Sequence, residues 1–295
     1  MSRARRASAE HDAVVIRVAG PTATISCDGQ EREARLRPRV PGGPAVAGDR
    51  VEVSEAGSEP AIVGVAPRST VLERGDGSDR KPRAIVANAD LVVIVAAVCE
   101  PPLHPRLIDR YLVAAEDGGL GSAIVLTKAD KAHDEAEVAE VVARYRAIGY
   151  PVLDGSAKDP AYGAQVRYLI GGRVAVLAGH SGVGKSTLTR RLTGVERAVG
   201  AVSAKVGTGR HTTSDPRMIP LPGGGAVVDT AGVRTFHLPR MDRSRLEAGF
   251  PEIVQAGQGC RFRGCAHDGD AGCVVEGAVS AERLDSYRRM LHDLP

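Results

Sequence analysis

The stretch GHSGVGKST, residues 179–187, decides how the rest of the chain is interpreted. It fits the pattern GxxxxGK[ST], follows the apolar run VAVLA and precedes a segment with helical character. In such a strand–loop–helix unit, backbone N–H groups of the loop surround phosphates, and the helix N-terminus adds its positive end. Lys185 is expected to reach the β- and γ-phosphates, and the Ser186 hydroxyl to bind Mg²⁺. The alternative is a glycine-rich turn without nucleotide. We predict a nucleoside triphosphate site formed by Gly179, His180, Ser181, Gly182, Val183, Gly184, Lys185, Ser186 and Thr187.

Two motifs beyond this loop favour GTP chemistry. In VVDTAG, Asp229 ends a strand-like run and is expected to hold Mg²⁺ through water, while the Gly232 N–H contacts the γ-phosphate. The polar stretch GRHTTSD lies between the phosphate loop and VVDTAG. In it, Thr212 or Thr213 can supply a second hydroxyl ligand to Mg²⁺. This order of motifs is typical of GTPases and less usual in small-molecule kinases.

A base-reading motif comes earlier in the chain than the phosphate loop. Residues 127–130 read TKAD after an apolar run, and Asp130 can accept hydrogen bonds from the guanine N1–H and exocyclic amine. Lys128 is expected to pack its stem over the ring. A backbone N–H in Ser156-Ala157-Lys158 is expected to donate to the guanine O6. Taken alone TKAD can arise by chance, so the candidate set Thr127, Lys128, Ala129 and Asp130 depends on the other motifs.

The chain divides into three regions. Residues 1–68 contain five short strand-like runs: AVVIRVAG, TATISCDG, REARLRPR, DRVEVSE and AIVGVAP. They predict a small β-barrel, an OB-fold first and an SH3-like barrel second, behind a basic N-terminal arm that is either disordered or a nucleic-acid contact. Residues 69–240 alternate strands and helices, which predicts a parallel sheet covered on both faces, with the polar stretch 69–84 as an exposed loop. Residues 241–295 are expected to form a small helical module, with helices over MDRSRLEAGFPEI and SAERLDSYRRMLHDL.

Composition narrows the class of protein without naming a partner. The 295 residues carry a net charge of +3, which is too small to indicate nucleic-acid binding by itself. Trp is absent and aromatic residues make up 3%, so an RNA contact would depend on Arg and Lys. The chain shows no secretion signal and no apolar run of bilayer length, so we expect a cytoplasmic protein without membrane contact.

Three of the five cysteines lie close together in the sequence. Cys260, Cys265 and Cys273 accompany His267, whereas Cys27 and Cys99 stand alone in apolar contexts and are expected in the core. Three thiolates and one imidazole suit a closed, tetrahedral structural Zn²⁺ site, with free thiols or an iron–sulfur site as alternatives. We take Cys260, Cys265, His267 and Cys273 as the metal ligands.

The order TKAD–SAK–GHSGVGKST–HTT–DTAG resembles that of circularly permuted GTPases, and more narrowly the bacterial small-ribosomal-subunit-dependent GTPase A family. NADLVVIV, LIDRYL, GRHTT and CRFRGCAH are similar to family stretches, and the resemblance covers essentially the whole chain. It implies an α/β P-loop GTPase sheet with an N-terminal OB-fold and a C-terminal zinc module. Thr127 departs from the usual Asn, which puts in doubt a contact that props the phosphate loop. Ala231 departs from the commoner Pro.

The same resemblance implies hydrolysis of GTP to GDP and phosphate, stimulated by the small (30S) ribosomal subunit late in its maturation. It also implies contact with 16S rRNA, and we expect a monomer. Val233 stands where many GTPases carry a water-orienting Gln, and valine cannot bind water. We therefore expect slow intrinsic hydrolysis with Lys185, Ser186 and Thr213 as catalytic residues. His211 is either the in-chain replacement for the Gln or a solvated loop residue.

Two other classes of function stay open at this point. A small-molecule kinase could use the same phosphate loop, but it needs an acceptor pocket and a catalytic carboxylate for which the sequence offers no clear candidate. A nucleotide-regulated RNA-binding protein with negligible turnover is the second alternative. GTP hydrolysis measured with and without 30S subunits distinguishes the three.

Overall fold

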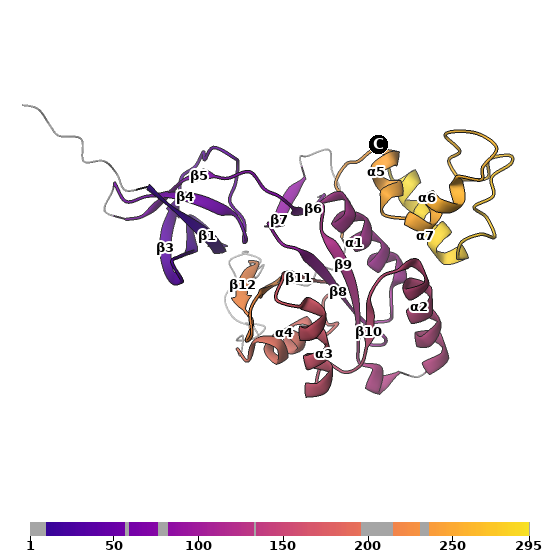
Figure 1. The fold of residues 1–295 in the computed structure, drawn as a ribbon, viewed down its shortest axis with the longest axis horizontal. Helices are drawn as coiled ribbons and strands as arrows, with labels where there is room; N and C mark the ends of the chain where they lie inside the picture. The colour runs from indigo at the N-terminus through magenta and orange to yellow at the C-terminus, as the bar shows by residue number, and fades with distance from the viewer. Residues whose placement is uncertain are drawn as a thin grey trace, which may run out of the picture.

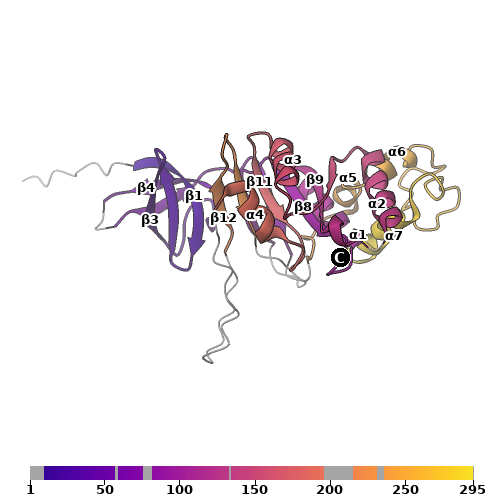
Figure 2. The ribbon, with the colours of Figure 1, turned by 90° about the horizontal axis from the view of Figure 1, so that it is seen from below.

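The computed structural model has three parts in a row along its longest axis (Figures 1 and 2). A β-barrel and a group of C-terminal helices lie at opposite ends, with a parallel sheet and its helices between them. The structure describes residues 10–56, 59–75, 82–132, 134–195, 215–230 and 236–294. No helix in these ranges is both long enough and apolar enough to cross a membrane.

The N-terminal part is the expected five-stranded barrel. Its strands are β1 (Glu10–Ala19), β2 (Thr22–Cys27), β3 (Gln30–Leu36), β4 (Arg50–Ser54) and β5 (Ala61–Val65). They pair in the order β1-β2-β3-β5-β4, and a β1–β4 ladder closes the barrel. Alternate residues such as Val15, Ile25 and Ile62 are fully buried inside it. This closed five-stranded arrangement confirms the OB-like barrel and not the SH3-like alternative.

The central sheet has the expected parallel order and both faces are covered. Its strands are β8 (Leu91–Ala97), β9 (Gly121–Thr127), β10 (Val152–Asp154), β11 (Val174–Ala178), β12 (Arg217–Pro220) and β13 (Ala226–Asp229), ordered β10-β9-β8-β11-β13-β12. All are parallel except β12, which runs antiparallel to β13. Side chains alternate between two cores because neighbouring strand residues point to opposite faces. One core includes α1 (Pro105–Asp117) and α2 (Glu135–Ile148), and the other α3 (Pro160–Ile170) and α4 (Lys185–Thr193).

Several elements differ from expectation. The stretch 69–84 is not simply an exposed loop, because Val71–Arg74 forms β6 and pairs with β7 (Arg83–Ala87). Leu72 is only 1% exposed and joins the core beneath α1, so tertiary packing overrides the polar local composition. Helix α3 and strand β12 are not among the expected elements. The signals for α3 are present, since Asp159 caps it, Pro160 begins it and Gly171 ends it.

The C-terminal part consists of three short helices around their own core. They are α5 (Arg243–Ala248), α6 (Pro251–Gly257) and α7 (Ala281–His292). The single helix expected over MDRSRLEAGFPEI is divided in two, because Pro251 cannot donate the backbone hydrogen bond that a continuous helix needs. Val113 of α1 joins the same core as Leu246, Phe250 and Tyr287, so these helices pack directly on the central part.

Candidate nucleotide site and metal centre

The phosphate loop lies where the sequence places it, between β11 and α4 at the carboxyl edge of the sheet. Gly179 has φ +145°, and a side chain there would come within 2.1 Å of the Val95 carbonyl oxygen on β8. Only glycine fits at this position, so the loop can turn tightly away from the strand. The loop thereby presents the N-terminus of α4, where free backbone N–H groups favour an anion.

Lys185 folds back over the loop that precedes it. Its side chain is largely buried, and Nζ donates to the carbonyl oxygens of Gly179 at 2.8 Å and His180 at 2.7 Å. Burial lowers the pKa of Lys185 from 10.5 to about 8, partly offset by the attraction of Asp229. An anion bound in the loop would favour the charged form of this lysine.

The base-reading corner meets the phosphate loop through Thr127. This residue ends β9 and is fully buried, and its hydroxyl donates to the Val183 carbonyl oxygen at 2.5 Å. The Ala96 carbonyl lies at 3.3 Å from the same hydroxyl. The contact that the Thr127 departure put in doubt is therefore made by a shorter side chain. Lys128 follows with φ +61°, which turns the chain away from the strand.

TKAD and SAK come together across β9 and β10. The Ala129 N–H donates to the Gly155 carbonyl oxygen at 3.0 Å, which ties the two loops at their bases. One pocket is lined by residues of both loops and of the phosphate-loop helix: Thr127, Lys128, Asp130, Lys131, Ser156, Ala157, Lys158, Gly184 and Thr187. Three segments distant in sequence thus line one pocket at the same sheet edge.

Two residues beside this pocket were missed by sequence reasoning. The first is Lys131, which lines the pocket. The second is Glu100: its carbonyl oxygen accepts a hydrogen bond from Lys128 Nζ, and the Glu100 carboxylate lies 3.5 Å from Lys131 Nζ. Glu100 follows β8, whose end meets the same edge as TKAD. The rule that ligands bind at carboxyl ends of parallel strands would have pointed to it.

Asp229 ends β13 and is 2% exposed, directly opposite Leu177 of β11 in the ladder. Leu177 comes two residues before the phosphate loop begins, so the carboxylate lies at the same edge of the sheet. His211, Thr212, Thr213, Ala231, Gly232 and Val233 lie outside the described residues.

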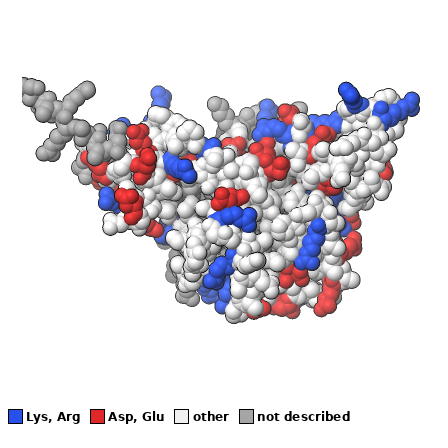
Figure 3. Space-filling view, viewed as in Figure 1, with Lys and Arg blue, Asp and Glu red and all other residues white. Residues whose placement is uncertain are grey.

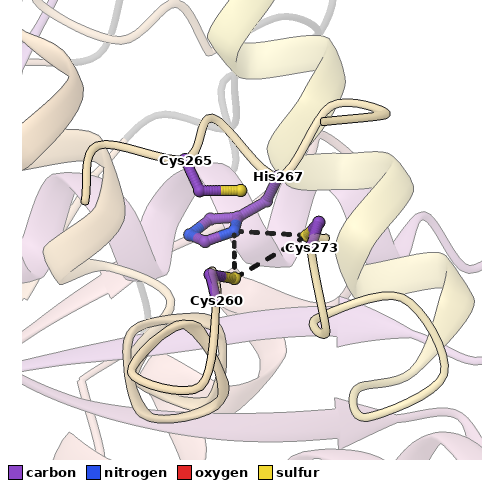
Figure 4. Close-up of side chains that lie close together, drawn as sticks. All are labelled: Cys260, Cys265, His267 and Cys273. Carbon is purple, nitrogen blue, oxygen red and sulfur yellow. Dashed lines mark hydrogen bonds between the residues drawn. The ribbon is translucent and has the colours of Figure 1, made fainter. Parts of the chain in front are cut away.

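The four cysteine and histidine residues converge after α6 (Figure 4). The sulfurs of Cys260 and Cys273 lie 3.9 Å apart, and Nδ1 of His267 is 3.6 Å from each. All four possible ligand atoms, including Sγ of Cys265, lie within 4.8 Å of one another. A tetrahedral ion with metal–sulfur bonds of about 2.3 Å separates two sulfurs by about 3.8 Å. The four residues can therefore hold a metal ion.

The helices on either side fix the backbone of the ligand loop. Arg243 of α5 donates to the carbonyl oxygens of Gly264 and Cys265. From α7, Arg288 donates to the His267 carbonyl at 2.8 Å and Tyr287 to the Ala266 carbonyl at 3.2 Å. Backbone N–H groups of residues 274 and 275 also lower the pKa of Cys260, which favours a thiolate. Such outer hydrogen bonds orient metal ligands.

Comparison with known proteins supports this architecture. A family model described as RsgA GTPase matches residues 65–239. A protein of Azotobacter vinelandii named small ribosomal subunit biogenesis GTPase RsgA is 41% identical over 277 residues, covering 90% of this chain and 79% of that protein. A Pseudomonas aeruginosa protein of the same name is 39% identical over 281 residues, covering 92% and 81%.

Two solved structures share the whole fold. YjeQ from Thermotoga maritima matches with a TM-score of 0.73 and 25% identity, covering 97% of this chain and 98% of that chain. YloQ, described as a circularly permuted GTPase, matches with a TM-score of 0.70 and 23% identity, covering 99% and 98%. TKAD and SAK precede the phosphate loop in the sequence yet line one pocket with it. The chain is a circularly permuted GTPase and belongs to the RsgA GTPase family.

Proposed function

We propose that this protein hydrolyses GTP to GDP and phosphate, is stimulated by the small ribosomal subunit, and acts late in the maturation of that subunit by binding 16S rRNA. Membership of a GTPase family supports the reaction, and the name of its relatives, small ribosomal subunit biogenesis GTPase, supports the ribosomal role. The observation that carries the proposal is the single pocket lined by TKAD, SAK and the phosphate-loop helix.

Guanine recognition is assigned to the two loops of that pocket. The Asp130 carboxylate would accept hydrogen bonds from the guanine N1–H and exocyclic amine, which adenine cannot supply in this geometry. The stem of Lys128 would cover one face of the ring, and a backbone N–H of residues 156–158 would donate to O6. Thr127 joins the TKAD loop to the phosphate loop through its hydrogen bond to Val183, and Ala129 joins it to the SAK loop through its hydrogen bond to Gly155.

Phosphate binding is assigned to residues 179–187. Lys185 already points into the loop and would exchange its two carbonyl contacts for the β- and γ-phosphates. Ser186, Asp229 and either Thr212 or Thr213 would hold Mg²⁺, for which hard oxygen donors are suited. When bound, Mg²⁺ neutralises charge on the phosphate oxygens.

In the reaction, the oxygen of a water molecule bonds to the γ-phosphorus as the bond from that phosphorus to the β–γ bridging oxygen breaks. The electron pair of the broken bond stays on GDP, and the protons of the water pass to oxygens of the phosphate formed or to solvent. Lys185 and the loop N–H groups would stabilise the charge that develops on the leaving GDP. The Gly232 N–H would contact the γ-phosphate. Val233 cannot orient the water, so His211 or a group from the ribosomal partner takes that role.

The metal centre is proposed to hold one structural Zn²⁺. Three thiolates and one imidazole at tetrahedral spacing leave no position for a substrate, which suits a structural and not a catalytic ion. We assign the chain to three units, residues 1–68, 69–240 and 241–295, and the buried clusters of the barrel, of the sheet and of the C-terminal helices support this division. We further propose a monomer that works in the cytoplasm.

One experiment tests the function directly. GTP hydrolysis is measured with and without purified 30S subunits, and strong stimulation is expected. Phosphoryl transfer to a metabolite without any ribosomal partner would instead identify a kinase. Tight binding of GTP and of 30S subunits without turnover would identify a nucleotide-regulated RNA-binding protein.

A further inference from the structure

The surface formed by α3 and α4 has an unusual charge pattern. The two helices pack side by side on one face of the sheet (Figures 1 and 2). Residues 160–195 contain no Asp and no Glu, although charged residues make up 25% of the whole chain. The charged residues in this stretch are all basic: Arg167, Arg173, Lys185, Arg190 and Arg191. In Figure 3, drawn in the view of Figure 1, red and blue groups lie close together over the β-barrel and the C-terminal helices.

Three arginines form a row along α3. Arg191 of α4 donates to the Lys158 carbonyl oxygen before α3 begins, at 2.5 Å. Arg167 reaches the Arg191 carbonyl oxygen at 3.3 Å, between the two helices. Arg173 donates to the carbonyls of Leu169 and Ile170 at the end of α3, at 2.6 and 2.9 Å. The 11 residues of α3 make this row about 16 Å long.

None of these three guanidiniums is paired with a carboxylate among the described residues. The hydrogen bonds that they make are to backbone carbonyl oxygens, so no carboxylate in the described part of the chain compensates their positive charge. The close packing of the helices also fixes Arg191, because a side chain at Gly163 would come within 2.4 Å of its Cγ. The charges are therefore held in place and not merely tethered to the surface.

A single aromatic side chain stands beside this row. Tyr168 is 90% exposed, whereas the chain's other five tyrosines are buried or half-buried. It lies on α3 about 200° around the helix from Val166 and from Ile170, both fully buried, so it points away from the core. It is not among the residues that line the nucleotide pocket. We call Arg167, Tyr168, Arg173 and Arg191 the α3 face.

Helix-end electrostatics explain only part of this arrangement. Basic residues in the last turn of a helix interact favourably with its negative end, which accounts for Arg167 and Arg191. Helix-end electrostatics explain neither the absence of Asp and Glu over the 36 residues 160–195 nor the exposure of Tyr168. Both features fit a polyanion that carries flat, stackable rings.

We propose that the α3 face binds single-stranded RNA, with the guanidiniums on successive phosphates and the Tyr168 ring stacked on an unpaired base. The inference deepens the proposed function, on which it rests for the presence of RNA, by assigning a contact to the GTPase part itself. An acidic peptide would satisfy the arginines but would give Tyr168 no partner. RNA satisfies both.

The test uses the full chain and a fluorescein-labelled, single-stranded 12-nucleotide oligouridine, with binding followed by anisotropy. Tyr168→Ala should weaken binding about tenfold, while Tyr168→Phe, which keeps the ring, should bind within about twofold of wild type. Arg173→Gln should reduce the slope of log affinity against log salt by about 0.7. The matched control is Arg146→Gln on α2, on the opposite face of the sheet, which removes the same charge and should change neither quantity by as much.

A second measurement locates the contact. The same oligonucleotide with one 4-thiouridine should crosslink to the peptide containing residues 158–173 in wild type and Tyr168→Phe, and much less in Tyr168→Ala. Thermal unfolding and basal GTP hydrolysis should be the same in both Tyr168 variants as in wild type.

The outcomes separate the two proposals. Crosslinks confined to other segments, together with wild-type affinity in Tyr168→Ala, would overturn the α3 face. Loss of 30S binding in Tyr168→Ala with unchanged oligonucleotide binding would assign the face to a ribosomal protein and overturn the RNA assignment. Absence of 30S-stimulated hydrolysis in wild type would count against the proposed function alone, because oligonucleotide binding does not depend on it.

Discussion

At the scale of single residues, Thr127 joins the base-reading strand to the phosphate loop through one hydroxyl. A hydroxyl has a single proton to donate, and here it goes to Val183 at 2.5 Å. Removing it would leave a buried carbonyl oxygen in the middle of the phosphate loop without its donor, at a cost of about 1–3 kcal/mol.

Thr127→Val keeps the shape of this side chain and deletes the donor. We expect GDP and GTP to bind about tenfold more weakly, because the phosphate loop is then less well positioned, with guanine still preferred over xanthine. Fluorescent-nucleotide titration measures both quantities. Thr127→Ser is the control, because serine keeps the hydroxyl. Asp130→Asn, in contrast, should shift the base preference of nucleotide binding from guanine toward xanthine. Unchanged affinity in Thr127→Val would show that the hydroxyl is dispensable.

Lys185 gives the nucleotide site a dependence on pH. Its pKa falls from 10.5 to about 8 on folding, so between these values the unfolded chain binds more protons than the folded one. Through this group, the free energy of unfolding therefore rises with pH across that window, and below about pH 8 the buried charge is a full cost. Phosphates bound in the loop would raise the pKa again.

We therefore expect GTP binding at pH 8.5 to take up a proton at Lys185, and affinity to fall as pH rises above about 8. Calorimetry in two buffers of different ionisation enthalpy measures the uptake. Lys185→Met should abolish it in whatever residual binding persists. A binding enthalpy that is independent of the buffer would contradict the assignment.

At the scale of elements, the loop that carries the metal ligands is held by hydrogen bonds from α5 and α7 and by the meeting of the four ligands. Residues 258–280, between α6 and α7, contain neither helix nor strand. The four ligand atoms of this segment lie within 4.8 Å of one another, so a bound ion would join its parts. Metal-free loops of this kind lose their structure because binding free energy is folding free energy.

Cys265→Ser or chelation should therefore release about one Zn²⁺ per chain and expose this loop to limited proteolysis. Nucleotide affinity should change by less than about twofold, since the loop contributes no residue to the nucleotide pocket. Metal analysis and mass spectrometry of the fragments provide the readouts. Cys99→Ser is the control, since that cysteine lies outside the cluster. Full protease resistance after zinc removal would argue against a structural role.

Elements with strong local signals could be predicted from sequence, and those fixed by packing could not. The apolar run at Leu91–Ala97 and the phosphate-loop motif specify β8 and the start of α4 without tertiary information. β6 forms because Leu72 is buried beneath α1, and a four-residue β12 gains its neighbours only in the folded sheet. Glu100 follows the carboxyl end of β8, where a ligand site is expected, but the approach of its carboxylate to Lys131 arises only when β8 and β9 align.

At the scale of the whole molecule, a buried ionic network attaches the C-terminal helices to the central part. Arg283 of α7 is 1% exposed, and its guanidinium lies 2.7 Å from Asp109 of α1 and 2.6 Å from Glu252 of α6. Tyr145 of α2 donates to the same Asp109 at 2.7 Å, and the guanidinium stacks 4.2 Å from the Phe250 ring centroid. Helices α6 and α7 of one part and α1 and α2 of the other therefore cannot slide past one another without breaking these contacts.

Arg283→Met should lower the free energy of unfolding by about 3–5 kcal/mol, because it removes the positive charge that pairs with the buried Asp109 carboxylate and the half-buried Glu252 carboxylate. Urea titration measures the loss. Arg289→Met on the exposed side of α7 removes an ion pair with Asp285 and should cost at most about 1 kcal/mol. If both variants lost the same free energy of unfolding, the cost would not depend on whether the ion pair is buried or exposed.

The order in which the sheet is completed also bears on how the protein is made. β11 pairs with β8 on one side and β13 on the other, yet residues 98–173 are synthesised between β8 and β11. A nascent chain that has emerged only as far as β10 therefore carries a parallel ladder whose inner edge has no partner. Such an edge is prone to pairing with other chains. The permuted connectivity leaves the nucleotide site at the same edge of the sheet. It also means that the nascent chain exposes an unpaired strand edge until β11 has left the ribosome.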